Sequence, residues 1–416
     1  TQKRTESEIF IMSKWWQFWK KEEKSSNAIR SIMQRNSATW SAREFVAFAT
    51  EGYRDNPTVR ACIMAKQKAA IECPIILVNE KGEAVENHPI LSLLNKPNPM
   101  QSWEKFLTQM IGSHDIAGEG DVLKIGIGQS VELWPLRPDW LEITTFSMGL
   151  PVSCSYTPSD TYEESTVKQY QFSELMIWAE YNPLFRWRGL SPLYSAAYSI
   201  DTLNEYAKSN KAMLENGMTP SGVLWTDSEV SDTSFNRLQE QFNGKYAGAK
   251  NSGKPMILDG GLKWQGMSFT PREMEFVSGK RLSQLDVCQV LRVPPQIIGI
   301  EGSQTFANYE QARAAFYEDE VIPMVNGLLS ELLGFLRKDF KIPPTYKLIV
   351  DTDGITALEP RRAERNKVID GLTSLKVDEK RAAMGYESAE GGDVILVDSN
   401  KIPLDMAGAD IPPLMP

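Results

Sequence analysis

Histidine and cysteine are scarce in this chain of 416 residues. Its 2 histidines, His88 and His114, leave little material for histidine-based catalysis or for a histidine-ligated metal. The cysteines show neither the spacing of a zinc site nor that of a disulfide framework, so we expect a reducing compartment. The 4 cysteines are Cys62, Cys73, Cys154 and Cys288.

Long hydrophobic runs are also missing. No apolar stretch approaches the roughly 20 residues that span a bilayer, and no secretory signal with a small-residue cleavage site is found. The net charge of −9 argues against a protein that grips nucleic acid over its whole surface. With 42% hydrophobic and 24% charged residues, the chain nevertheless has the composition of a globular protein with a buried core.

Catalytic motifs are absent or incomplete. Gly248–Pro255 matches a P-loop, G-x-x-x-x-G-K, but has Pro255 where the Mg²⁺-binding Ser or Thr belongs. Asp351 and Asp353 lack the further carboxylates of a calcium loop, and we interpret them as an exposed turn. We therefore expect no enzymatic activity, no cofactor and no metal. A hydrolase or nucleotide-using enzyme is kept as a competing class.

The N-terminal segment has a composition of its own. Residues 1–50 carry 9 basic and 5 acidic side chains, a net of +4, and four aromatic residues lie between the lysines of Lys14–Lys21. Such a segment could lie in a membrane interface, stack on single-stranded nucleic acid, or form a partly disordered arm that docks on a neighbouring subunit. The alternative function is therefore a peripheral membrane-associated structural protein. Its anchor would be Trp15, Trp16, Phe18 and Trp19.

The first part of the body reads as a mixed α+β block that ends near Pro183. Apolar spacing predicts helices over residues 56–73 and 103–116, with Lys66 as an imperfection in the first apolar stripe. A strand over Pro74–Val78 precedes Asn79–Gly82, which predicts the turn of a hairpin. Further short strands are expected around 121–127 and 130–135 and between 141 and 177.

Three long helices follow. Ser191 and Pro192 open the first, and Gly217 is its natural end. A capping box at Thr270–Glu273 opens the second, which should run to Leu291. The third is expected over residues 308–336, with a kink at the internal Pro323.

A small module is inserted between the first two long helices. It reads as a strand over Gly222–Trp225, a helix over Asp227–Tyr246 and a strand over Pro255–Leu258, with a third possible strand over Leu262–Trp264. Paired long helices that support such a module are unusual in a monomeric enzyme. They are typical of a ring-shaped oligomer, in which the pairs line up as a wall.

Several segments then agree in order and spacing with one known family. They are His88–Pro99, Trp134–Pro138, Gly189–Leu193, Asn216–Leu224, Val293–Gly299, Thr305–Pro323 and Asp378–Asp393. In these segments the chain resembles the portal proteins of tailed bacteriophages with siphovirus-type heads and of related gene-transfer particles. The resemblance covers about residues 56–397. One departure is Trp178, where relatives often carry His.

The resemblance implies an α+β portal fold with an elongated subunit. Its implied divisions are an arm (1–40), a wing (41–190), a first stem helix (191–217), a β-α-β clip (218–269), a second stem helix (270–292), a tunnel loop (293–307), a kinked long helix with a return to the wing (308–358), a crown (359–402) and a flexible tail (403–416).

The same resemblance implies the function. The protein would form the ring at the unique capsid vertex, act as the channel for DNA packaging and ejection, and dock the terminase and the head–tail connector. Its partners would be further copies of itself in a dodecameric ring, double-stranded DNA without sequence specificity, the large terminase, the major capsid protein and the connector protein, with no stable membrane insertion. It would reside in the virion, and in the host cytoplasm during assembly.

Candidate contact residues follow from these divisions. The tunnel candidates are Glu301, Gln304, Thr305, Phe306 and Asn308, although Phe306 could instead pack against its own subunit. The stem candidates Lys208, Lys211, Lys280 and Arg281 could face DNA or pair with Glu205 or Glu275 of neighbouring subunits. The clip candidates, expected to face the terminase or connector, are Lys245, Lys250, Asn251 and Lys254. Because each phosphate contact would retard sliding DNA, we expect a largely neutral or negative tunnel.

Overall fold

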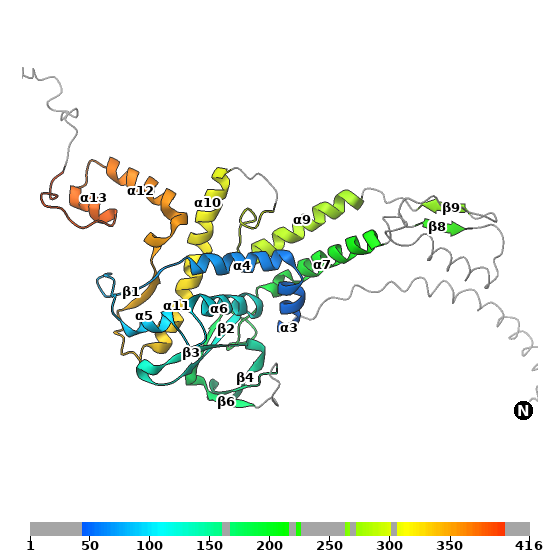
Figure 1. Cartoon of the computed structure of the whole chain (residues 1–416), viewed down its shortest axis with the longest axis horizontal. Helices are drawn as coiled ribbons and strands as arrows, with labels where there is room; N and C mark the ends of the chain where they lie inside the picture. The colour runs from blue at the N-terminus through cyan, green and yellow to red at the C-terminus, as the bar shows by residue number, and fades with distance from the viewer. Residues whose placement is uncertain are drawn as a thin grey trace, which may run out of the picture. The chain divides into compact units, whose positions relative to one another are not determined.

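The computed structural model describes residues 44–159, 167–215, 222–225, 263–266, 272–300 and 306–395 (Figure 1). The chain divides into two compact units, residues 1–42 and 43–416, and all described residues belong to the second. The α-helices are α3 (Phe45–Ala47), α4 (Pro57–Ile71), α5 (Pro89–Asn95), α6 (Trp103–Ala117), α7 (Leu193–Glu215), α9 (Arg272–Val290), α10 (Phe306–Phe316), α11 (Ile322–Leu336), α12 (Glu359–Gly371) and α13 (Val377–Ala383). The strands are β1 (Ile75–Val78), β2 (Glu119–Ile125), β3 (Glu132–Leu136), β4 (Leu141–Ser147), β5 (Leu150–Tyr156), β6 (Lys168–Gln171), β7 (Leu175–Ala179), β8 (Gly222–Trp225), β9 (Lys263–Gly266) and β10 (Lys347–Val350).

The helix starts follow from local sequence chemistry. Asn56 caps α4, because its side chain accepts hydrogen bonds from the backbone N–H groups of Thr58 and Val59, and Pro57 occupies the first turn. His88 caps α5 in the same way through Nδ1, which accepts from the Ile90 N–H. The α6 helix ends at Gly118, whose left-handed backbone (φ 85°) suits glycine.

Two three-stranded antiparallel sheets lie in the first part of the chain. Their strand orders are β3-β2-β7 and β4-β5-β6, and a small cluster of buried residues joins them, including Leu123, Leu141 and Cys154. The mixed α+β block expected up to Pro183 is confirmed. The turn expected at Asn79–Gly82 also forms, but a single bridge, Val78 to Ala84, follows it. The β1 strand pairs along its length with β10 instead.

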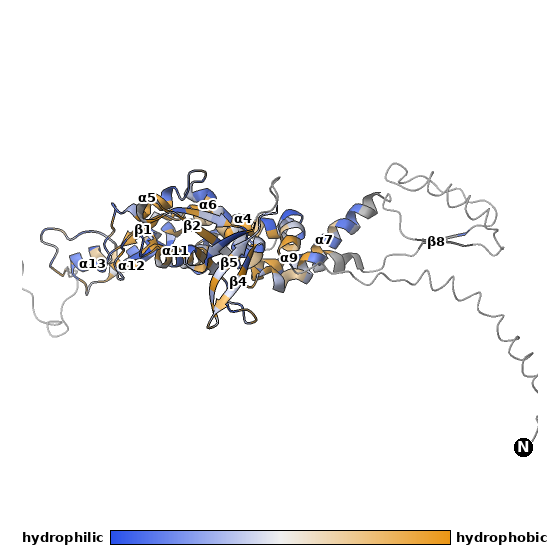
Figure 2. Ribbon diagram, turned by 90° about the horizontal axis from the view of Figure 1, so that it is seen from below, coloured by the Kyte–Doolittle hydropathy of each residue, from blue (hydrophilic) through white to orange (hydrophobic). Residues whose placement is uncertain are grey.

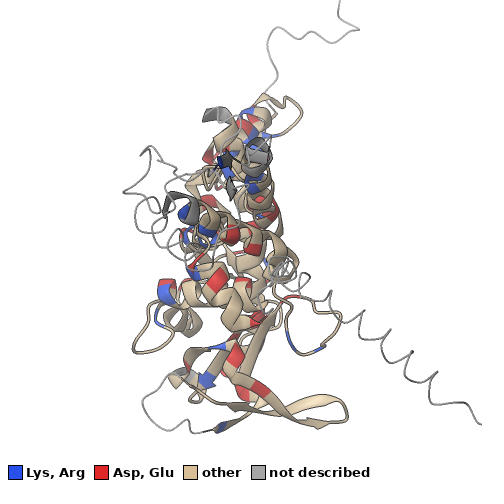
Figure 3. Cartoon of the chain, turned by 90° about the vertical axis from the view of Figure 1, so that its right-hand side faces the viewer, with Lys and Arg blue, Asp and Glu red and all other residues tan. Residues whose placement is uncertain are grey.

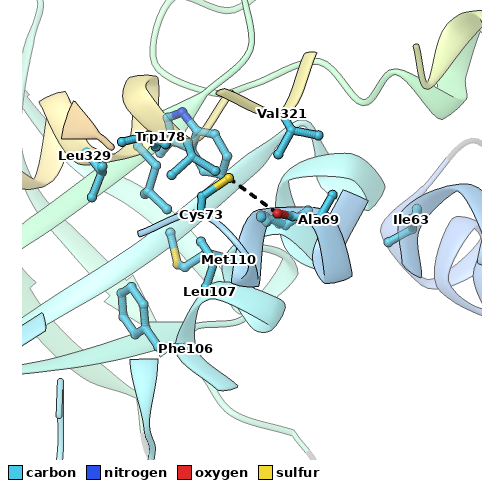
Figure 4. Close-up of a cluster of buried hydrophobic side chains, with 14 of the residues drawn as sticks. Ile63, Ala69, Cys73, Phe106, Leu107, Met110, Trp178, Val321 and Leu329 are labelled. Carbon is cyan, nitrogen blue, oxygen red and sulfur yellow. Dashed lines mark hydrogen bonds between the residues drawn. The ribbon is translucent and has the colours of Figure 1, made fainter. Parts of the chain in front are cut away.

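The main core lies where α4, α6 and α11 meet the strands. Figure 2 shows hydrophobic residues concentrated in these elements. Figure 4 shows how the aromatic and sulfur-containing side chains Phe106, Met110 and Trp178 lie near Cys73, whose Sγ donates to the Ala69 carbonyl oxygen. These side chains are fully or almost fully buried.

The long helices α7 and α9 lie side by side (Figure 1). Ser199 of α7 donates from Oγ to Asp286 Oδ2 of α9 at 2.8 Å. At Gly279 of α9, an added Cβ would lie 2.6 Å from the Tyr206 hydroxyl of α7, so glycine permits this close approach. Both helices were expected from the sequence, and both are confirmed over 193–215 and 272–290. Gly217 and the cap residue Thr270 lie outside the described residues.

The third long helix is interrupted, which the sequence did not predict in this form. A π-helical turn, Tyr317–Val321, separates α10 from α11, and Pro323 lies in the first turn of α11. Proline has no N–H to donate within a helix and its ring clashes with the preceding turn. The wider π-helical turn accommodates this proline, where a single helix kinked at Pro323 was expected.

The inserted module is described only in part. The β8 strand agrees with the expectation for Gly222–Trp225, and it pairs antiparallel with β9. The possible third strand, expected over Leu262–Trp264, corresponds to β9 at Lys263–Gly266. The expected helix over Asp227–Tyr246 and strand over Pro255–Leu258 lie outside the described residues.

Candidate functional site

The α7–α9 pair is the candidate wall of a channel. The first half of α7 is buried at Leu193, Ala197, Ile200 and Leu203, whereas Ala207 is exposed. On α9, Val287 and Cys288 near the C-terminal end are buried, whereas Val277 and Leu282 are exposed. The pair is therefore packed against the core at one end only.

One face of α9 changes from covered to exposed along its length. Gln284 and Cys288 contact α4, since Gln284 Nε2 donates to Thr58 Oγ1 and Cys288 Sγ lies 4.0 Å from Cys62 Sγ. Val277 lies on the same face, because it is seven residues before Gln284 and eleven before Cys288. It is 72% exposed. An exposed valine that continues a face covered elsewhere by α4 makes this part of α9 a candidate surface for a neighbouring copy.

The four predicted stem residues are all exposed. Lys208 pairs with Glu205 of its own helix at 2.8 Å, which differs from the neighbouring-subunit pair that was one of the two expectations. Lys211 is on α7, and Lys280 and Arg281 are on α9. Figure 3 shows acidic and basic residues interspersed along the described helices.

Most of the other candidates lie outside the described residues. These are Glu301, Gln304 and Thr305 of the predicted tunnel loop and Lys245, Lys250, Asn251 and Lys254 of the predicted clip. Phe306 is the first residue of α10. Asn308 lies in the first turn of this helix and is exposed. The two tunnel candidates that are described thus lie at the end of α10 that adjoins the loop.

A buried ionic cluster, which sequence reasoning did not find, includes the π-helical turn that follows the other end of α10. Lys66 Nζ of α4 binds Asp115 Oδ1 of α6 at 2.9 Å and Glu320 Oε1 of the π-helical turn at 2.8 Å. All three side chains are less than one-tenth exposed. Arg292, which follows α9, lies 3.5 Å from the other oxygen of Glu320. The cluster joins α4, α6, the π-helical turn and the end of α9.

The charges of this cluster stabilise one another. Burial alone would lower the pKa of Lys66, but the carboxylates of Asp115 and Glu320 outweigh it and raise the pKa. Burial would raise the pKa of Asp115, but the Lys66 ammonium and the neighbouring His114 together outweigh it and lower that pKa. Lys66 was noted in the sequence only as an imperfection in an apolar stripe. A lysine on an apolar helix face could have predicted a buried ion pair, because a buried lysine needs a partner of opposite charge.

A second buried cluster holds the connection into α7. Glu119 accepts from Arg188 Nε at 2.6 Å and from the Gly189 N–H at 2.7 Å, and Arg188 also donates to the carbonyl oxygen of Pro138 at 2.7 Å. Beside it, Asp121 is fully buried and neither carboxylate oxygen has a hydrogen-bond partner in the described structure. Burial, with the nearby Glu119 charge, raises the pKa of Asp121 well above its usual value.

The residues examined for catalysis have structural surroundings. His88 is a helix cap, and His114 is buried and stacks on Trp178 with 3.8 Å between ring centroids. Asp351 caps a short turn by accepting from the Asp353 N–H, as an exposed turn predicts. Within the described ranges, no three His, Cys, Asp or Glu side chains gather as a metal site would require. A groove of about 240 Å³ between β4 and residues 185–188 is lined mainly by apolar and arginine side chains.

Comparison with known families decides the assignment. Residues 57–385 match the phage portal protein family. The chain belongs to the phage portal protein family. This confirms the resemblance drawn from the sequence, and the mixture of helices and strands is that of the portal fold.

Individual relatives agree with this assignment. An uncharacterized protein of Rickettsia bellii is 28% identical over 392 residues, which cover 92% of this chain and 99% of that protein. A chain in the neck of the native gene transfer agent (GTA) particle, computed with C12 symmetry, is 27% identical with a TM-score of 0.64, covering 84% of this portal chain and 96% of the other. A portal protein of the HK97 phage family from Corynebacterium diphtheriae is 13% identical with a TM-score of 0.52, and covers 75% and 96%. At that identity it shows the fold alone.

The expected function at the capsid vertex is thereby confirmed. Portal proteins are structural components of phage particles, and nothing in the comparisons supports the alternative of a membrane-anchored protein. Of the helices in the described part of the portal chain, none combines the length and apolar character that crossing a bilayer requires. The residues proposed as a membrane anchor lie outside the described ranges.

Proposed function

We propose that copies of this chain close into a twelve-fold ring whose channel is walled by the α7–α9 pair and conducts double-stranded DNA. The observation that carries the proposal is the exposed continuation of the α9 face at Val277, 72% exposed, beyond its contact with α4. In a ring, this surface would be covered by the next subunit. The C12 symmetry of the related particle neck supports the stoichiometry.

The charge of the wall suits a conduit. The Lys208 ammonium lies 2.8 Å from Glu205, so its charge is balanced within its own helix. Because phosphate contacts bind DNA irrespective of sequence and slow its passage, a wall of balanced charges lets the duplex slide. Lys280 and Arg281, three and four residues after Val277, lie toward the same α9 face and would border the next subunit, so Lys211 on α7 is the stem cation proposed to face the duplex.

The ring is tested by electron microscopy of the purified protein in negative stain. We expect radially symmetric rings with a central hole. A preparation that stays monomeric at micromolar concentration would contradict the proposal. Liposome flotation with and without residues 1–26 tests the membrane alternative separately.

The assignment of the subunit's elements to a wing, a stem, a clip and a crown is part of the same proposal. The sheets up to β7 would form the wing, α7 and α9 the stem, the module that contains β8 and β9 the clip, and α12 with α13 the crown. The clip would dock the large terminase and later the connector, and the wing would contact the major capsid protein.

Charge reversal at Lys250 and Lys254 should then weaken terminase binding while rings still form. Loss of the rings themselves would refute the docking role.

The loop before α10 is proposed to form the tunnel constriction. Glu301, Gln304, Thr305 and Phe306 would touch the duplex through short polar and aromatic contacts that carry no sequence readout. Phe306→Ala should therefore change DNA retention in filled particles. Unchanged packaging and retention would show that Phe306 packs within its own subunit.

We also propose that the protein has no catalytic activity of its own. Energy for DNA movement would come from the terminase. An ATPase assay on the purified ring without terminase should give only background hydrolysis. Turnover that is abolished by Lys254→Ala would instead support the competing nucleotide-using class.

A further inference from the structure

Helices α4 and α9 run parallel and in register. Thr58 contacts Gln284 at 3.5 Å and, one turn later, Cys62 contacts Cys288 at 4.0 Å, so both pairs are 226 residues apart in sequence. A further turn along, Lys66 and Arg292 both bind Glu320, at 2.8 and 3.5 Å. The cysteine pair is thus the middle of three successive contacts, and the contacts on either side fix the spacing of the two sulfur atoms.

The packing around the sulfur atoms is tight. Cys62 and Cys288 are 0% and 2% exposed, and the neighbouring Val59, Ile63 and Val287 are each 0% exposed. Close-packed interiors leave side chains little room to move apart. A disulfide has an S–S length of about 2.05 Å, so each sulfur atom needs to move by only about 1 Å, a distance that rotation about χ1 supplies.

We propose that Cys62 and Cys288 form an intramolecular disulfide on exposure to a peroxide, and that this bond fastens α9 to α4. In the reducing compartment expected from the sequence, the pair stays reduced. The bond would form once the protein meets an oxidant outside that compartment. The proposal concerns the subunit alone, so its failure would leave the proposed ring and channel untouched.

The chemistry balances with hydrogen peroxide as the oxidant. The Cys288 thiolate attacks one peroxide oxygen, an S–O bond forms, the O–O bond breaks, and hydroxide leaves and is protonated to water. Cys62 then gives up its proton, attacks the Cys288 sulfur and expels the second oxygen as water. Two thiols lose two electrons, and one peroxide is reduced to two waters. The hydrogen bond from Cys62 lowers the pKa of Cys288, which favours Cys288 as the first nucleophile.

The other two cysteines provide internal controls. Cys73 and Cys154 are also buried, at 4% and 0% exposed. Cys73 Sγ donates to the Ala69 carbonyl oxygen rather than to a second sulfur, and burial raises its pKa to about 12. If burial alone governed oxidation, all four cysteines would behave alike. If geometry governs it, only Cys62 and Cys288 will be linked.

The decisive experiment is a peptide map without reduction of the full-length protein, treated with hydrogen peroxide under native conditions and then alkylated in denaturant. We expect one linked peptide pair containing Cys62 and Cys288, with Cys73 and Cys154 recovered as alkylated free thiols. Cys73→Ala should leave the link in place, and Cys288→Ala should abolish it. Recovery of Cys62 and Cys288 as free thiols or sulfinic acids, or linked to Cys73 or Cys154, would overturn the proposal.

Thermal unfolding tests whether the bond fastens the helices. The oxidised protein should melt about 5–10 °C above the reduced protein, because the crosslink closes a long loop in the unfolded chain. Dithiothreitol should reverse the shift, and Cys62→Ala should show no redox-dependent shift. A linked protein that melts with the reduced form would overturn this part of the proposal.

Discussion

Lys66 is the centre of the ionic cluster that links α4 to α6 and to the π-helical turn, and through Glu320 to the end of α9. Its ammonium is 5% exposed and binds two carboxylates that are 1% and 8% exposed. Lys66→Met removes the ammonium that Asp115 and Glu320 share, so Asp115 loses its ion pair with lysine and Glu320 keeps only Arg292 at 3.5 Å. We expect a loss of about 3–5 kcal/mol in the free energy of unfolding, because breaking a buried pair strands its charges. Urea denaturation measures it.

The control for this prediction is Lys208→Met. Lys208 makes an ion pair of similar length with Glu205, but both side chains are largely exposed. Exposed pairs contribute little to stability, so the unfolding midpoint should not change measurably. Equal effects of the two substitutions would show that the buried cluster has no special role.

Asp121 should make the free energy of unfolding fall as the pH rises, whereas a carboxylate in an ion pair makes it rise with pH. Its raised pKa means that the folded protein holds the proton more tightly than the unfolded chain does. The stability from this group is fully present below its unfolded pKa of about 3.9 and is lost as pH rises through the folded value. We expect Asp121→Asn to melt about 3–5 °C higher than the native protein at pH 8, by a smaller margin at pH 5, and at nearly the same temperature only below about pH 4.

The neighbouring Glu119 gives the matched comparison. Glu119→Gln keeps the size of the side chain but removes the charge that binds Arg188, so it should lower the melting temperature at pH 8. Calorimetry between pH 5 and pH 8 separates the two carboxylates. An Asp121→Asn variant that melts below the native protein at pH 8 would show that Asp121 is ionised and favourable there.

Single residues were predictable from the sequence where their role is local. The aspartates at 351 and 353 form the turn that was expected from their immediate sequence. The role of Lys66 was not predictable, because Asp115 lies 49 residues away and reaches it only through the packing of α4 on α6. Asp121 carries no sequence signal that distinguishes it from an exposed aspartate.

At the scale of elements, the join between α6 and α7 depends on two glycines. An added Cβ at Gly118, which has φ 85°, would collide with the backbone of Leu190, and one at Gly189 would collide with the Gly118 carbonyl. We expect Gly118→Ala and Gly189→Ala each to destabilise the protein by more than about 2 kcal/mol, since backbone must shift. Gly334→Ala in α11 is the control. There an added Cβ meets nothing within 4 Å.

Chemical denaturation of the three glycine variants separates the cost of a backbone collision from the general effect of replacing glycine by alanine. Alanine is preferred over glycine inside a helix by about 1 kcal/mol, so Gly334→Ala should be neutral or stabilising. If all three variants lose stability to the same extent, the close approach of residues 118 and 189 is not what holds this join.

Helices were more predictable than strand pairing. Caps and apolar spacing gave α4, α6, α7 and α9 close to their observed bounds because helical contacts are local. The partner of β1 was missed, since turn chemistry at residues 79–82 identifies a turn but not the strand that fills the sheet edge, and β10 lies far along the chain. The π-helical turn before Pro323 was missed because proline predicts an interruption without specifying its form.

At the scale of the whole molecule, the family was recognisable from the order of its motifs, and the match over residues 57–385 confirms it. The residues that contact DNA or a neighbouring subunit were harder to predict from the sequence. A cationic side chain on a helix, such as Lys208, can pair with a carboxylate of its own helix or with one of a neighbouring subunit. Which of the two occurs depends on the surface that faces it in the ring, and the sequence of one subunit does not specify that surface. The exposed face of α9 adds what the sequence could not, a candidate surface for the second subunit of the proposed ring.

That surface gives the last prediction. Val277→Asp places a charge where the next subunit is proposed to bury a valine, so it loses the apolar contribution of about 1.5–3 kcal/mol at each interface and adds a desolvation cost. Because about 1.4 kcal/mol corresponds to a factor of ten, we expect subunit association to weaken at least about tenfold. Sedimentation velocity should show the ring replaced by smaller species, while the far-UV circular dichroism spectrum stays that of the folded subunit.

Val368→Asp is the matched control, because Val368 is 62% exposed on α12, away from the α7–α9 pair. It introduces the same charge at a similar exposure, and rings should persist. Rings that survive Val277→Asp but not Val368→Asp would move the subunit interface from the two long helices to the C-terminal ones. The channel wall would then have to be assigned to a different set of helices.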